Sequence, residues 1–210
     1  MAITQQKPSV KLTVGAQYIC FNTPDANGDY NPATYESAVH KLPTVVNVTV
    51  TDNTDAYDSY ASGEIYDSDA PVKTKDIQTE QLAFSDALLA RMRGDTIDGG
   101  AVLAGGIATR PIFAYGIVVK KKDSSLDLRW YPKCKLTENT DATATSTDSH
   151  SDQTDTTTIR AYGFDDDQHQ EVKCLTGETG YDGITEDAFF AEPILTIAGV
   201  KALIPSGGTQ

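Results

Sequence analysis

Alternation of apolar and polar side chains with a period of two residues is the strongest structural signal in this sequence. From Val10 to Cys20 the even-numbered residues are all apolar, and the positions between them include Lys11, Thr13 and Gln17. Leu126 to Leu136 repeats the pattern. Successive side chains of a strand point to opposite faces, so this pattern predicts half-buried β-strands and argues against a helical protein.

Further strands are expected where β-branched or apolar residues cluster between turn residues. The expected ranges are 44–51, 72–79, 111–119, 157–164 and 169–175, the last pairing back on 157–164, with an apolar run at 194–200 near the end. Residues 111–119 are apolar on both faces, as in a central strand, and should form a hairpin with 126–136. The pattern predicts about nine short strands in a mostly antiparallel fold.

One α-helix is expected, from Glu80 to Arg93. Phe84, Leu88 and Met92 recur every four residues and would pack on a sheet. Thr79 is the expected N-terminal cap, and a glycine at position 94 should end the helix. The expected fold is mainly β, with two packed antiparallel sheets (a β-sandwich or partial barrel), one flanking α-helix and long loops or arms.

Two polar segments interrupt the strand pattern of what we expect to be a single domain over 1–198. Residues 52–70 hold aspartates and tyrosines but no lysine or arginine, which favours a long solvated loop that orders on assembly. Its candidate contact residues are Asp52, Asp55, Tyr57, Asp58, Tyr60 and Tyr66. A Thr/Ser/Asp-rich spacer covers about 137–156, the glycine-rich 94–109 resembles a linker, and 199–210 should be a flexible tail.

The charge balance limits the partners of the chain. Acidic residues outnumber basic ones by 30 to 17, giving a formal net charge of −13. This surplus opposes tight binding to phosphate backbones, although double-stranded DNA could still pass the protein without specific binding.

The cysteines and the N-terminal sequence indicate where the protein is made. Cys20, Cys134 and Cys174 are widely spaced and form no CxxC pair, which is typical of buried thiols in a reducing compartment. Residues 1–8 lack the apolar core of a signal peptide, and no apolar run reaches the roughly 18 residues of a membrane helix. We therefore expect synthesis in a cytoplasm and no membrane partner.

Catalytic, cofactor-binding and metal-binding residues are not expected. His40, His150 and His169 lack partner ligands at zinc-site spacing, and neither a nucleophile elbow nor a phosphate-binding loop is present. The acidic stretch beginning at Asp25 has its glycine at the wrong position for an EF-hand loop, so it predicts a turn. Asp165 to Asp167 also predicts an exposed turn. The chain is therefore not expected to be an enzyme.

Trp130–Asn139, WYPKCKLTEN, followed by Ser151–Thr156, SDQTDT, resembles the hallmark segment of siphophage major tail proteins. In that family an aromatic strand ends in a K-x-x-x-x-E turn, and an S-x-x-T strand follows a Thr/Ser/Asp spacer. Shorter likenesses occur in the family's order over roughly 11–175. They are the early V-G strand at Val14-Gly15, the acidic segment at 52–60, G-E-I at 63–65 and Leu88-Leu89 before Gly94.

The resemblance implies a structural role in a virion tail. In such proteins six copies form a ring around a lumen, and the rings stack into a tube through which DNA passes on ejection. The implied partners are other copies of the chain and the tape-measure, distal tail and tail-terminator proteins. An acidic lumen would let DNA pass without holding it.

Two other functions remain open at this point. One is the tube protein of a contractile tail or a phage-derived bacteriocin. The other is a secreted β-sandwich module for adhesion or carbohydrate binding, which the Thr/Ser/Asp spacer suits and the missing signal peptide opposes.

Overall fold

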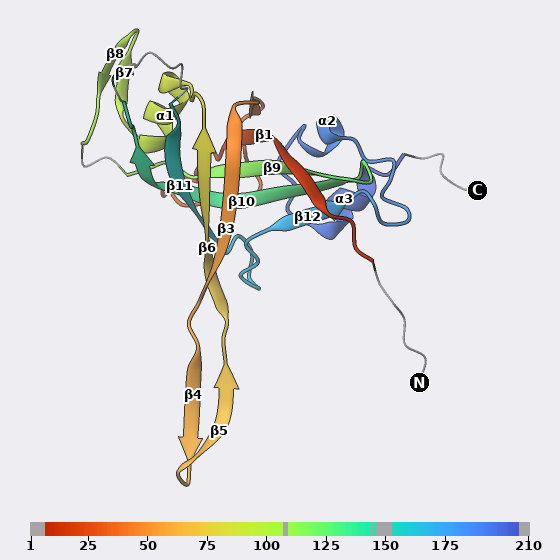
Figure 1. The fold of residues 1–210 in the computed structure, drawn as a ribbon. Helices are drawn as coiled ribbons and strands as arrows, with labels where there is room; N and C mark the ends of the chain where they lie inside the picture. Colours follow the sequence, from red (N-terminus) through yellow and green to blue (C-terminus); the bar gives the residue numbers. More distant parts are fainter. Residues whose placement is uncertain (1–6, 107–108, 144, 146–152, 206–210) are drawn as a thin grey trace.

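The computed structural model describes residues 7–106, 109–143, 145 and 153–205. It is mainly β, as the alternation predicts (Figure 1). The strands are β1 (Lys11–Phe21), β2 (His40–Leu42), β3 (Val45–Thr54), β4 (Tyr57–Ala61), β5 (Glu64–Asp69), β6 (Val72–Gln81), β7 (Thr96–Asp98), β8 (Ala101–Leu103), β9 (Phe113–Lys121), β10 (Leu126–Thr140), β11 (Asp155–Tyr162) and β12 (Val172–Leu175). The helices are α1 (Asp86–Arg93), α2 (Glu186–Phe189) and α3 (Ile197–Ala202). Residue 144 and residues 146–152 of the central spacer, His150 and Ser151 among them, lie outside the described residues.

Eight strands form one antiparallel sheet in the order β2-β1-β9-β10-β11-β6-β3, with β12 pairing β10. The sheet curls so that β1 and β3 line the same groove, which makes it the partial barrel form of the expected fold. A buried hydrogen-bond chain crosses the inside of the curl. The Tyr115 hydroxyl donates to Gln17 Oε1 at 3.0 Å, and Gln17 Nε2 donates to Gln81 Oε1 at 3.2 Å. These bonds tie β1 and β9 to β6, which is far along the sheet.

Strand β10 is the centre of the sheet because it has partners along both edges. One edge pairs with β9, which confirms the hairpin expected from the sequence. The other edge pairs with β12 in its first half and with β11 in its second half. The expected pairing of 169–175 with 157–164 is therefore wrong. The register with β9 shifts between Tyr131 and Cys134, around Pro132, which has no N–H to give to a ladder.

Two cores lie on opposite faces of the sheet. One contains Trp130 and Tyr18 and is covered by the segment that carries α2 and α3. The other contains Tyr115 and Ile159 and is covered by α1 and by the curl of the sheet. Strand β1 contributes to both: Gln17, Ile19 and Phe21 are buried although they lie opposite the expected core face, whereas Val10 and Leu12 are exposed. The half-buried strand expected there is instead buried on both faces at one end and open at the other.

Helix α1 is shorter than expected. Glu80 and Gln81 belong to β6, where they pair with β11, and the N-cap is Ser85. The Thr79 hydroxyl is buried against that of Thr157 at 2.6 Å, so it does not cap the helix. The helix ends where expected, because Gly94 has a φ of 78°, in the left-handed region that favours glycine.

Residues 197–202 are helical, and residues 206–210 of the expected flexible tail lie outside the described residues. α3 begins at Ile197 and carries Val200 into the first core, so the expected tail boundary at residue 199 falls inside a helix. The segment is also held by Glu186 of α2, which accepts a hydrogen bond from the Tyr18 hydroxyl at 2.5 Å and pairs with Lys41 at 2.8 Å. Burial, together with this bond, raises the pKa of Tyr18 to about 12.

Candidate assembly surface

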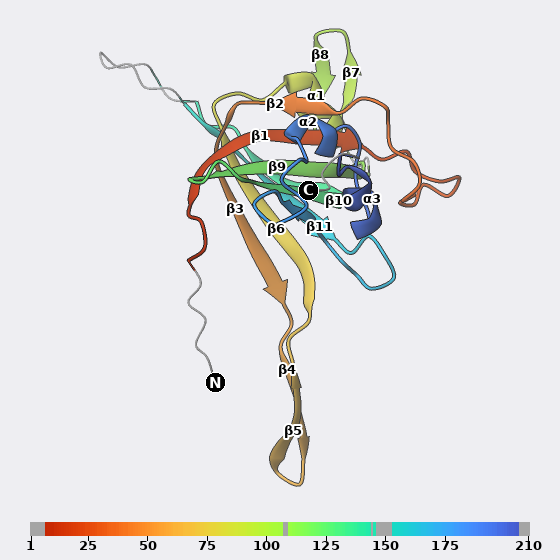
Figure 2. The ribbon, with the colours of Figure 1, turned by 90° about the vertical axis from the view of Figure 1, so that its right-hand side faces the viewer.

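The acidic segment 52–70 forms a β-hairpin rather than a loop. β4 and β5 pair antiparallel and project from the body as one arm, which Figures 1 and 2 show from two directions. Ser62 and Gly63 form the turn with φ values of 54° and 83°, the positive angles of a two-residue hairpin turn. Every residue of β4 and β5 is exposed. The segment is exposed as expected, but it is a paired hairpin and not a loop; its ordering on assembly stays a prediction.

Lysines of β6 provide the charge compensation that the segment itself lacks. At the base of the arm, Lys73 pairs with Asp55 at 2.6 Å and Lys75 pairs with Asp52 at 2.7 Å. The hydrogen bond from Lys73 lowers the pKa of the Asp55 carboxyl. β3 pairs with β6 as far as Thr54 and Val72, and β4 and β5 pair beyond them as a separate two-stranded sheet, so strands pair on both sides of a base that its charges alone would keep apart.

The structure brings all six sequence-predicted contact residues onto this arm or its base. Asp52 lies within β3, and Asp55 directly follows β3 at the base of the arm. Tyr57, Asp58 and Tyr60 lie on β4 and Tyr66 on β5. The tip is the most open part, with Tyr66 82% exposed and Tyr60 68% exposed.

The tip also carries an apolar residue that the sequence did not single out. Tyr60 lies directly opposite Ile65, so their side chains share one face of the hairpin, and Ile65 is 58% exposed. Two large exposed side chains on one face of a projecting arm are typical of a contact surface.

Two edges of the main sheet are open as well. Among the described strands, β3 pairs only with β6, which leaves its other side without a partner. β2 pairs only with residues 17–19 of β1, so the first half of β1 is also unpaired on that side. Unpaired strand edges readily pair with strands of another chain.

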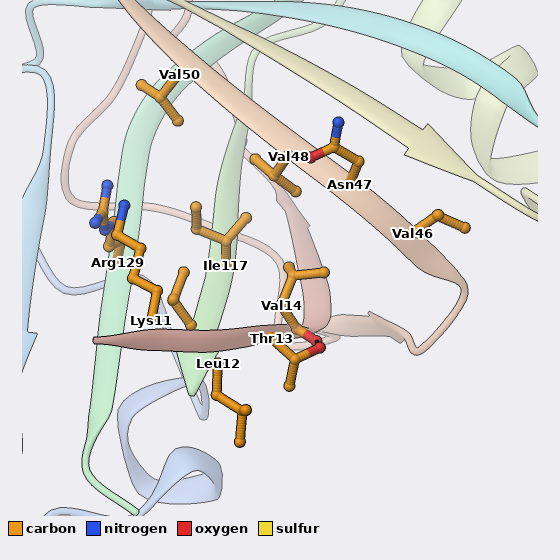
Figure 3. A pocket seen from close by; sticks show the side chains of 11 residues that line it. Lys11, Leu12, Thr13, Val14, Val46, Asn47, Val48, Val50, Ile117 and Arg129 are labelled. Atoms are coloured by element: carbon orange, nitrogen blue, oxygen red, sulfur yellow. Dashed lines mark hydrogen bonds between the residues drawn. The ribbon is translucent and has the colours of Figure 1, made fainter. Parts of the chain in front are cut away.

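A groove of about 420 Å³ lies between these two edges (Figure 3). Val14 of β1, Val48 of β3 and Ile117 of β9 contribute apolar walls. Arg129 lies at the β10 side, where it pairs with the buried Asp127 at 2.7 Å. Leu12 and Val46, at the rim, are 63% and 48% exposed.

A second concave region, which the sequence did not reveal, gathers cations. Two adjoining hollows of about 550 and 260 Å³ share Thr109, Ile112 and Lys135 in their walls. We call this region the basic cleft; its cationic residues are Lys73, Arg110, Lys133 and Lys135. They come from three separate parts of the sequence, so no local pattern marks them.

The acidic turns considered as cation sites are occupied by internal bonds. Asp25 Oδ1 accepts the backbone N–H groups of Asn27 and Asp29, both at 2.9 Å, and Glu36, the acid at the twelfth position counted from Asp25, pairs with Arg91. Asp165 accepts from the His169 backbone, and its second oxygen lies 2.6 Å from His169 Nδ1. Both turns are confirmed.

Within the described part of the chain, no three His, Cys, Asp or Glu side chains gather as a metal site would need. None of the helices described is long and apolar enough to cross a membrane. Cys20, Cys134 and Cys174 are buried and unpaired, as expected.

No family model and no curated protein matches the sequence. Three solved structures are similar over most of the chain. The anti-feeding prophage cap (AFP tube terminating cap) has a TM-score of 0.44 and 9% identity, covering 83% of this chain and 95% of that one. The anti-feeding prophage baseplate structure has a TM-score of 0.39 and 10% identity, covering 81% and 97%. The PVC sheath–tube complex of an extracellular contractile injection system has a TM-score of 0.35 and 12% identity, covering 75% and 88%.

Proposed function

We propose that this chain is a structural subunit of a phage-type tail, in which copies of the chain join into a tube. The observation that carries the proposal is one domain with two open sheet edges and a fully exposed tyrosine-bearing arm. A monomer with these features exposes surfaces that favour association, and joining edges around a ring removes them. The resemblance of Trp130–Asn139 to siphophage major tail proteins supports the same role.

The finer form of the proposal follows that resemblance. Six copies form a ring, rings stack, and double-stranded DNA crosses the lumen without specific binding. In this role the chain acts by shape and contact, with no catalytic residue, cofactor or metal. A tube from a contractile tail is the second form; it differs in carrying a sheath on its outer surface.

Ring joining uses the open edges as heterologous contacts, in which one surface of a copy meets a different surface of the next. Such contacts close into rings when the rotation between copies completes a circle. The β3 edge and the open half of β1 flank a groove whose walls include Val14, Val48 and Ile117, so a strand from a neighbouring copy would gain backbone hydrogen bonds and bury these apolar side chains there.

Electron microscopy of purified full-length protein over a range of concentrations tests the proposal. Rings or tubes of uniform diameter are expected, with a sedimentation coefficient that rises with concentration. A chain that remains monomeric at all concentrations would refute it. Pulldown of a sheath protein by the assembled tubes would favour the contractile form, and smooth tubes alone the siphophage form.

A further inference from the structure

The basic cleft is an unusual feature on a chain with a formal net charge of −13. Its walls contain Lys73, Lys133, Lys135 and Arg110, against one carboxylate, Asp29, among the described residues. Like charges gathered in a concavity raise the local concentration of ligands of opposite charge. The cleft therefore has the electrostatics of an acceptor for an anionic group.

Two of these cations lack a carboxylate partner in the subunit. Lys133 and Lys135 form no ion pair with a described residue, although both are partly buried. Lys133 instead lies over the Tyr30 ring, with Nζ 5.0 Å from the ring centroid. Arg110 is positioned by hydrogen bonds to the carbonyls of Leu136 and Thr137. Lys133 and Arg110 are thus held in place without an ion pair to a described residue, whereas Lys73 is paired with Asp55.

The arm has the complementary charge. Asp58, Glu64, Asp67 and Asp69 are exposed, form no ion pair with a described residue, and stand beside no basic residue of the arm. Strands of five and six residues extend roughly 17–20 Å from the body. The arm therefore presents both carboxylates and large side chains at a distance.

The arm cannot meet the cleft of its own subunit without bending back. It points away from the body in both views (Figures 1 and 2), and the pairing of Lys73 with Asp55 fixes its base. A second copy can bring the two surfaces together with both unchanged.

We infer that the basic cleft of one copy receives the acidic β4–β5 arm of another copy. The inference rests on the proposed self-assembly and names the surfaces that make one of its contacts. Carboxylates of the arm pair with Lys133 and Lys135, and a tip tyrosine enters the hollow beside Tyr30. Partly desolvated charge pairs of this kind orient partners and select the correct register.

Two charge-reversed variants of the full-length protein test the contact. One carries Asp58→Lys and Asp67→Lys on the arm, and the other carries Lys133→Glu and Lys135→Glu in the cleft. Each alone places like charges against each other, so each should need at least about tenfold more protein than the parent to associate. In an equal mixture in which the two variants alternate, every arm meets a cleft of opposite charge. Association should therefore return toward the parental level.

The controls separate charge from folding. Lys120→Glu with Lys122→Glu makes the same charge change outside the cleft and should associate like the parent. Lys133→Gln with Lys135→Gln removes the cations without reversing their charge, and should weaken association by a smaller factor than the charge reversal. This variant replaces the reversed one as the test if the reversal disturbs the fold. Thermal melts of every variant show which ones are folded. Raising the salt concentration should weaken parental association, because the contact is electrostatic.

Sedimentation measures association, and electron microscopy shows whether the associated copies form rings or tubes. The arm–cleft contact and the proposed tube can therefore be refuted separately. Salt-sensitive association that follows the charge rules without rings or tubes would support the arm–cleft contact and refute the tube. Tubes that form unchanged from folded cleft variants would support the tube and overturn the contact. Failure of the mixture to recover, with both variants folded, would also overturn it and leave the cleft to another anion. A parental chain that never associates would overturn both.

Discussion

A single methyl group added at Gly116 of β9 should destabilise the protein by disturbing the packing of the C-terminal segment on the sheet. A Cβ atom there would lie 2.5 Å from Phe190 Cε1 and 3.1 Å from Tyr18 Cβ, whereas carbon atoms in contact normally sit about 3.5–4.0 Å apart. The Phe190 ring stacks on Tyr18 with centroids 3.9 Å apart and an interplanar angle of 2°. Phe190 must therefore move by roughly 1 Å, and the stack cannot survive that shift.

The expected cost of Gly116→Ala is the sum of two effects. Overpacking a core position costs about 1–3 kcal/mol, and a lost aromatic pair costs about 0.5–1.5 kcal/mol. We expect a loss of about 2–4 kcal/mol in the free energy of unfolding. The only tryptophan, Trp130, lies 5.1 Å from Phe190 between ring centroids, so its fluorescence reports on the perturbed site during denaturant titration.

Two comparison variants decide the interpretation. Gly100→Ala makes the same chemical change where no atom lies within 4 Å, so it should change stability by less than about 0.5 kcal/mol. Combining Gly116→Ala with Phe190→Leu should cost less than the sum of the two single changes, because the smaller side chain removes the clash. A Gly116→Ala protein that unfolds within about 0.5 kcal/mol of the parent would show that the C-terminal segment does not pack as described.

Three further predictions concern the helix, the arm and a pH-sensitive pair. Leu88→Ala should cost about 2–5 kcal/mol in denaturant titration, because Leu88 is 7% exposed, whereas Leu82→Ala at a 51% exposed site should change little. Replacing residues 56–70 by a short Gly/Ser turn should leave the melting temperature nearly unchanged, since the arm adds nothing to either core, yet abolish long tubes in electron micrographs. The hydrogen bond to Asp165 raises the His169 pKa above its ordinary 6.5, so below pH 6.5 the pair is intact as long as Asp165 stays ionised, and its contribution is lost as pH rises through the raised His169 pKa. NMR titration should show the His169 pKa falling toward 6.5 in Asp165→Asn, and an unchanged value would contradict the pairing.

The strands were largely predictable because their evidence is local. The alternation at Leu126–Leu136 and the apolar run before it identified the β9–β10 hairpin, and the lysine-rich turn between them made the pairing clear. The far end of α1 was equally predictable, because a glycine at position 94 supplies the left-handed residue that ends a helix. In each case the residues that decide the outcome are neighbours in sequence.

Errors arose where a distant partner decided the outcome. Thr79 and Glu80 suit a helix start, but β11 pairs with them and extends β6 instead. The aspartates of 52–70 predicted an open loop, but lysines of β6 neutralise the base of the arm. The 169–175 strand joined β10, because that strand is long enough to serve two partners on one edge.

The sequence by itself determined the mainly β fold class of the protein and the acidic, tyrosine-rich character of its arm. Side-chain period and charge are properties of consecutive residues, and a strand keeps them wherever it lies in the fold. Only the tertiary structure decided which edges stay open, where the sheet curls, and that Lys73, Arg110, Lys133 and Lys135 share one cleft. Strand pairing and concavity depend on contacts between segments far apart in the chain, and neighbouring residues do not encode them.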